Sequence, residues 1–78
     1  MIELKEGDYF WFSEGRCWLL AKCTGICETL LKGPRFTRVK IRYVTKCGDC
    51  YSSTLNLHSD ARMATDAEAM EGKLRYGL

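Results

Sequence analysis

The chain has 78 residues, of which 46% are hydrophobic and 12% aromatic, and its formal net charge at pH 7 is +2. This length predicts one domain with a small core, and the apolar content excludes a disordered tail. The net charge is too small for bulk electrostatics alone to indicate a nucleic-acid binder, so only the distribution of charge can indicate that function.

No run of the sequence approaches the roughly 18 apolar residues that a membrane span needs. Glu3 and Glu6 lie where a secretory signal would need a cationic start and an apolar run. We therefore expect a cytoplasmic protein with no membrane partner. In the cytoplasm the five cysteines would be reduced, which favours free thiols or a metal site over disulfides.

Aromatic runs and alternation of apolar and polar residues predict four strands, over 9–12, 17–23, 36–46 and 51–57. The first of these is apolar on both faces, so it is either covered on two sides or offers one aromatic face to a partner. Residues 24–34 are predicted as a loop with a short strand, because Gly33-Pro34 prevents a helix there.

One helix is predicted over 65–76. Thr65 and Glu68 have the spacing of a capping box at its start. Gly72 is expected to weaken this helix by about 1 kcal/mol relative to alanine, so the helix should depend on docking. The apolar residues that share the face predicted to pack on the sheet are Ala67, Met70 and Leu74.

Four or five short strands followed by a helix predict a mainly β (α+β) domain. Glu6-Gly7-Asp8 leads into the aromatic strand, and three further strands with short turns follow. This pattern resembles the small SH3-like barrels of the Tudor and KOW type, which implies a four- to five-stranded antiparallel barrel over 6–58 with ligand-binding aromatics on one rim. In size and style the chain also resembles the small accessory proteins of phages and plasmids.

The predicted central strand is apolar on one side and basic on the other. Val39, Ile41 and Tyr43 alternate with three basic residues, and no acidic residue lies between Lys32 and Lys46. Cations on one face recur every 6.8 Å or so, which is comparable with successive phosphates of a nucleic acid. The predicted interface, with two aromatic residues as stacking planes, is Arg35, Arg38, Lys40, Arg42, Lys46, Trp11 and Tyr43. The alternative is a solvated sheet face, or an edge kept soluble by charge.

Four cysteines form a C-x3-C and a C-x2-C pair, which approaches the four-thiolate pattern of a zinc ribbon. Zinc bound there would be structural, because four thiolates leave no open position. A simple hairpin between the second and third strands would instead place the two pairs at opposite ends. Three alternatives remain at this point, namely reduced thiols with no cofactor, disulfides, and a zinc-ribbon-like site formed by Cys23, Cys27, Cys47 and Cys50.

The sequence favours a non-enzymatic binding module. The single histidine, His58, is followed by Ser59 and Asp60, but adjacent residues of an extended chain point apart and cannot form a catalytic relay. The first hypothesis is a module that contacts nucleic acid, or an acidic or nucleic-acid-handling protein, through the basic strand. The second is a phage-type inhibitor or adaptor that binds and blocks a host protein. The third is a structural zinc-ribbon-like interaction module.

Overall fold

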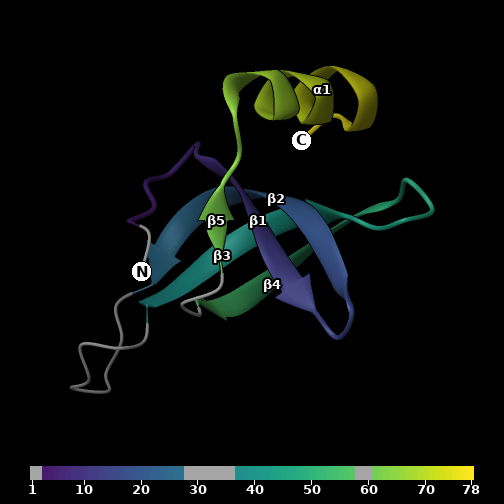
Figure 1. Cartoon of the computed structure of the whole chain (residues 1–78). Coiled ribbons are helices and arrows are strands. Elements are labelled where there is room, and N and C mark those ends of the chain that lie inside the picture. Colours follow the sequence, from purple (N-terminus) through teal and green to yellow (C-terminus); the bar gives the residue numbers. More distant parts are fainter. Residues whose placement is uncertain (1–2, 28–36, 58–60) are drawn as a thin grey trace.

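The structure is a computed structural model, and it describes residues 3–27, 37–57 and 61–78. The elements in chain order are β1 (Tyr9–Glu14), β2 (Cys17–Cys27), β3 (Thr37–Val44), β4 (Cys50–Leu57), β5 (Arg62–Met63) and α1 (Asp66–Tyr76). The strands form one antiparallel sheet in the order β4-β3-β2-β1-β5 (Figure 1). A mainly β domain with one C-terminal helix is therefore confirmed.

The second strand is longer than predicted. β2 continues through a register shift between Cys23 and Gly25 and still pairs with β3 at Cys27. Residues 24–27 are thus part of the sheet and not of a loop. The rest of the predicted loop, and the polar segment 58–60, lie outside the described residues.

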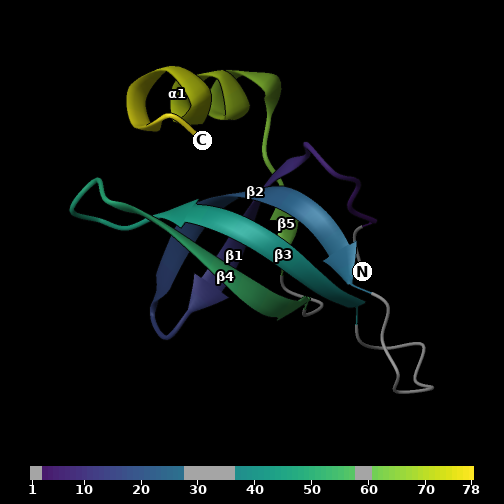
Figure 2. The same ribbon diagram turned by 180° about the vertical axis from the view of Figure 1, so that it is seen from behind.

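The sheet is curved, but it is not closed into a barrel. Within the described residues, β4 pairs with β3 alone and β5 with β1 alone. Figure 2 shows β2 and β3 arching, with α1 above their convex side. Closure would need hydrogen bonds between β4 and the opposite end of the sheet, and the described residues form none. The prediction of a barrel is therefore replaced by an open curved sheet.

The main core lies on the concave side of the sheet. Val39 and Ile41 are 0% and 2% exposed there, as the alternation along the central strand predicts. Side chains from four strands and the residue before β5 complete this cluster, whose buried members are Phe10, Phe12, Leu19, Ala21, Cys23, Val39, Ile41, Leu57 and Ala61. Burial of these apolar side chains is the main stabilising term for so short a chain.

A second, smaller cluster lies between the convex side and α1. It consists of Leu20, Val44 and Leu78, with Tyr9 and Trp11 packed against it. The hydroxyl of Tyr9 donates a hydrogen bond of 2.7 Å to the carbonyl of Leu78, which holds the C-terminus against β1. β1 is therefore covered on both faces, the first of the two predicted alternatives.

α1 packs through a different face from the predicted one. Met70 and Leu74 are 56% and 77% exposed, and Ala67 is exposed as well. The buried residue of the helix is Gly72, where an added Cβ would lie 2.6 Å from Cδ2 of Leu20. The helix backbone approaches the sheet so closely here that a larger residue would force the Leu20 side chain to shift. In the described part of the chain no helix is long and apolar enough to cross a membrane.

Thr65 begins α1 with the predicted capping box. Its hydroxyl accepts a hydrogen bond of 3.2 Å from the backbone N–H of Glu68, and the Glu68 carboxylate accepts one of 2.9 Å from the N–H of Thr65. Because Thr65→Ala leaves an N–H of the first turn without its partner, we expect the free energy of unfolding to fall by about 1 kcal/mol in urea denaturation. Thr65→Ser keeps the hydroxyl and should retain most of the stability, so equal losses in both variants would contradict this role.

Candidate nucleic-acid interface

Three cations project from the convex side of β3. Arg38, Lys40 and Arg42 are exposed, and they alternate with the buried Val39 and Ile41. Val44, the next residue on the convex side, belongs to the cluster under α1. The row of cations therefore begins in the uncovered part of the convex side and runs toward the helix.

β2 adds a fourth cation that the sequence analysis missed. Lys22 lies opposite Arg42 in the register of β2 and β3, and opposed residues of antiparallel strands project from the same face. The Nζ atom of Lys22 also lies 5.7 Å from the ring centre of Tyr9. The period of two along β2 already places Lys22 with Leu20, but only the pairing with β3 shows which cations it joins. We call Lys22, Arg38, Lys40 and Arg42 the basic face.

Polar residues without negative charge border the basic face on its β4 side, whereas Glu6 lines a small hollow with Lys22 on the other side. On β4 they are Ser52, Thr54 and Asn56, which are exposed and pair with Arg42, Lys40 and Arg38. On the β2 side Gly25 lies opposite Lys40, and a Cβ there would come within 3.7 Å of Cδ of the lysine. The lysine stem thus runs beside the backbone of Gly25, at a distance that would be ordinary van der Waals contact for a Cβ there. β3 and β4 contain no acidic residue.

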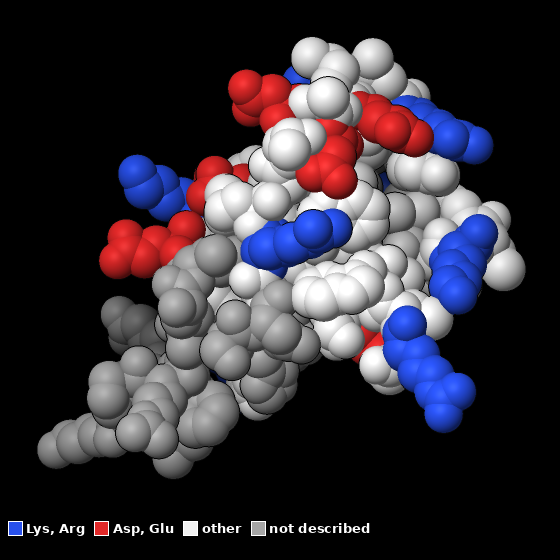
Figure 3. Space-filling view, viewed as in Figure 1, with Lys and Arg blue, Asp and Glu red and all other residues white. Residues whose placement is uncertain are grey.

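No cation of the basic face forms a salt bridge with a residue that the structure describes. The one salt bridge among the described residues joins Arg75 to Glu71 at 3.3 Å and lies on α1. In Figure 3, Asp and Glu side chains lie over α1 and, in a second group, on the left of the view. Like charges opposed across two strands, as in the pair Lys22 and Arg42, destabilise a sheet. A bound anion would remove that cost.

The structure brings together only part of the predicted interface. Tyr43 lies on the concave side. The centre of its ring is 5.8 Å from that of Phe12, in an edge-on arrangement, and 6.1 Å from that of Tyr51. It therefore offers no stacking plane beside the cations. Trp11 is on the convex side but packs against the cluster under α1. Lys46 follows the end of β3 and lines a separate groove. Arg35 lies outside the described residues.

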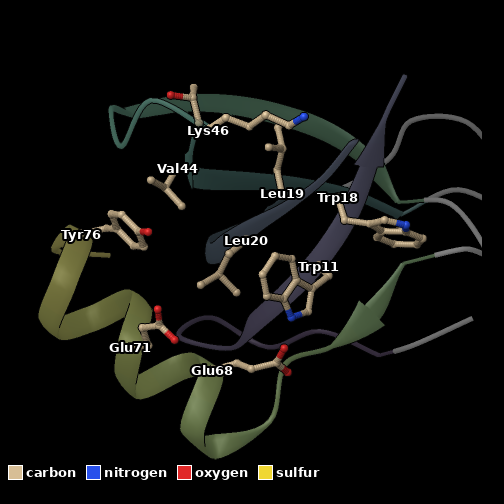
Figure 4. A pocket seen from close by; sticks show the side chains of 10 residues that line it. Trp11, Trp18, Leu19, Leu20, Val44, Lys46, Glu68, Glu71 and Tyr76 are labelled. Carbon is tan, nitrogen blue, oxygen red and sulfur yellow. The ribbon is translucent and has the colours of Figure 1, made fainter. Parts of the chain in front are cut away.

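That groove, of about 380 Å³, separates α1 from the convex side (Figure 4). Trp11, Trp18 and Tyr76 form its aromatic walls, and Glu68 and Glu71 of α1 lie along one side. The backbone N–H of Thr65 lowers the pKa of Glu68, so this carboxylate stays ionised at neutral pH. The carboxylate of Glu68 disfavours phosphate at this rim, whereas Glu71 is paired with Arg75 and Lys46 also lines the groove.

Some polar groups of the groove find partners within the chain, and one does not. The guanidinium of Arg62 lies 5.5 Å from the ring centre of Trp18, and Glu71 pairs with Arg75. The indole N–H of Trp11 is buried without a hydrogen-bond partner in the described residues, and it points toward the carboxylate of Glu68 (Figure 4). A small movement of Glu68 would satisfy that donor, so the groove needs no ligand for this purpose.

The four candidate zinc ligands do not meet in the fold. Cys23 and Cys27 lie in the last part of β2, beside the beginning of β3, whereas Cys47 and Cys50 follow the end of β3. Among the residues that the structure describes, no three His, Cys, Asp or Glu side chains are grouped so as to hold a metal ion. Burial raises the pKa of the Cys23 thiol, which disfavours the thiolate that zinc requires.

We therefore expect the purified chain to carry no zinc. Native mass spectrometry should give the mass of the polypeptide alone, and a chelator should leave the melting temperature unchanged, because no thiolate cluster couples metal binding to folding. The mass under denaturing conditions serves as the reference. One equivalent of zinc, together with a chelator-induced fall in melting temperature, would contradict this expectation.

Comparisons with protein-family models, with curated proteins and with solved structures find no match to this chain. The arrangement of its own residues is therefore the guide to its function. In that arrangement the basic face is the feature that a partner of opposite charge would recognise.

Proposed function

We propose that this chain is a non-enzymatic module that binds the phosphate backbone of nucleic acid through its basic face. The observation that supports this is where the charge lies in the sheet. The four cations are on β2 and β3, which are interior strands, whereas the edge strand β4 has no charged residue. Charge that served to protect an edge would lie on β4, so edge protection does not account for the basic face.

The kind of contact follows from the side chains around the cations. Ammonium, guanidinium and hydroxyl groups are the donors that proteins direct at phosphate oxygens, and the β4 hydroxyls of Ser52 and Thr54 lie beside the cations of β3. Tyr9 is the aromatic ring near them, and Lys22 already lies over it. Contacts with the backbone, and little base stacking, are therefore expected, with weak sequence preference.

The SH3-like resemblance belongs to this proposal. Consecutive antiparallel strands and a terminal helix support it, and the open sheet would then be a barrel of that type whose last seam is not closed. The further likeness to phage- or plasmid-type accessory proteins rests on size and style.

Fluorescence anisotropy with labelled single- and double-stranded oligonucleotides tests the proposed function. If all four cations contact phosphates, the logarithm of the association constant for duplex should fall with the logarithm of salt concentration with a slope of about −3.6. Absence of salt-sensitive binding to either oligonucleotide would reject the proposal.

A matched pair of variants tests whether the basic face is the site. Lys40→Gln with Arg42→Gln should weaken binding and reduce the salt slope by about 2, because each cation accounts for about one unit. Lys73→Gln with Arg75→Gln removes the same charge from the end of α1 and should leave the slope unchanged. Equal losses in both variants would show that net charge and not the basic face drives binding.

A second candidate function is protein binding, as in the inhibitor or adaptor hypothesis. The two apolar faces of β1 that suggested it are both covered, but α1 presents Met70 and Leu74 to solvent one turn apart. An exposed apolar stripe of this kind is typical of a helix that meets a partner. A stoichiometric partner recovered from bacterial lysate, and lost with Met70→Glu and Leu74→Glu, would favour this function over nucleic-acid binding.

A further inference from the structure

β4 is an edge strand of eight residues, and no described residue pairs with its outer edge. Natural edge strands are usually protected by charge, proline, a bulge or short length. β4 contains no charged residue, proline or glycine, and its pairing with β3 runs over the whole strand without a register shift. The opposite edge, β5, has only two residues. β4 is therefore the edge that is ready to pair.

The backbone groups of β4 that point outward can be assigned. The N–H of Thr45 donates to the carbonyl of Asp49 at 2.8 Å, which makes these two residues a hydrogen-bonded pair of the hairpin. Such pairs alternate along an antiparallel ladder, so Ser53 directs its N–H and C=O groups toward Ile41 on β3. The N–H and C=O groups of Ser52 and Thr54 consequently point away from β3 and are available to another strand.

We propose that two copies of this chain pair antiparallel through β4, with Ser53 of one copy opposite Ser53 of the other on a twofold axis. In this register Ser52 of each copy faces Thr54 of the second copy on the convex side, and their outward backbone groups form the new ladder. On the concave side Tyr51 faces Leu55 of the second copy. Hydroxyl pairs and aromatic–apolar pairs are favourable across antiparallel strands.

A second copy fits this edge better than a charged partner strand. β4 is neutral, so pairing it with its own copy brings no like charges together. A strand with the cations of β3 would place like charges opposite each other in such a pairing. Tyr51 is 52% exposed in the single chain, and pairing gives its ring an apolar neighbour. The partner edge is also of equal length by symmetry, so every residue of β4 except Leu57 finds a β4 residue opposite it.

The pairing also joins the two basic faces. A twofold axis perpendicular to the sheet leaves both convex sides facing the same way, so the sheet continues across β4 of the two copies. The two β3 strands are then three strand spacings apart, about 14 Å, with the hydroxyl groups of Ser52 and Thr54 between the two rows of cations. The pairing itself does not depend on the proposed function, since its test uses no nucleic acid.

Light scattering coupled to size exclusion tests the proposal. The native chain should show twice the 8.9 kDa mass of one copy. Ser53→Lys and Ser53→Asp each place two like charges on the twofold axis and should each be monomeric. A mixture of the two should restore a dimer that contains one copy of each, because opposite charges then meet. A native chain that stays monomeric at the concentrations used for NMR, or a dimeric Ser53→Lys variant, would overturn the proposal.

Two further variants separate pairing from folding. Thr54→Pro removes an N–H that points away from β3, so circular dichroism should stay native while the dimer is lost. Met63→Lys adds the same charge as Ser53→Lys to an exposed residue of the other edge strand, and it should stay dimeric. Loss of the dimer in Met63→Lys would show that added charge alone prevents association and would contradict pairing through β4.

Discussion

Phe10→Ala should remove a large part of the free energy of unfolding of this chain. Phe10 is 0% exposed and lies in β1 between Ala21 of β2 and Met63 of β5, with its ring 6.2 Å from that of Phe12. Replacing a buried phenylalanine by alanine costs about 3–5 kcal/mol. A chain of 78 residues has a total stability of about 4–12 kcal/mol, so the loss takes a large part of it. Circular dichroism and urea denaturation measure the effect.

Two variants make this result interpretable. Phe10→Leu keeps most of the apolar volume and should cost less than Phe10→Ala. Leu74→Ala truncates an equally apolar residue that is exposed on α1, and it should change the free energy of unfolding by no more than about 0.5 kcal/mol. If the urea midpoint of unfolding were nearly the same for Phe10→Ala and for the native chain, the concave cluster would not be what holds the strands together.

Gly72→Ala should destabilise the chain, although alanine is the better helix former. In an isolated helix this change would stabilise by about 1 kcal/mol. Here the new Cβ would lie 2.6 Å from Cδ2 of Leu20 and 3.4 Å from Cδ1 of Leu78, and both leucines are packed with Val44 in the cluster under α1. Leu20 also lines the groove beside α1, so rotation of its side chain can relieve only part of the overlap without disturbing this cluster. Overpacking of this kind costs about 1–3 kcal/mol.

Gly72→Val should have the larger effect and should separate α1 from the sheet, because valine combines the same overlap with greater bulk and lower helix propensity. The fluorescence of Trp11, which packs against this cluster, reports the separation directly. Met70→Val is the control, since Met70 is exposed on the same helix and shares only the propensity change. Higher stability in Gly72→Ala would show that α1 does not dock through this glycine.

Local patterns in the sequence determined the features that depend on neighbouring residues. The alternation from Arg38 to Tyr43 gave the correct inner and outer sides of β3, because successive side chains of a strand point to opposite faces. The capping box at Thr65 needs only residues one helical turn apart, and it is present. The same alternation along the strand predicts that Arg38, Lys40 and Arg42 form one row on β3.

Tertiary structure alone decided which strands lie side by side and which surfaces are covered. Lys22 joined the basic face through its pairing with Arg42, and Trp11 was removed from it by packing against the cluster under α1. Gly72, and not the apolar stripe at Met70, became the docking point of α1. Each outcome depends on contacts between segments that are distant in the chain. Strand register and the close approach of backbones decide these contacts, and hydrophobic periodicity reports only the local pattern.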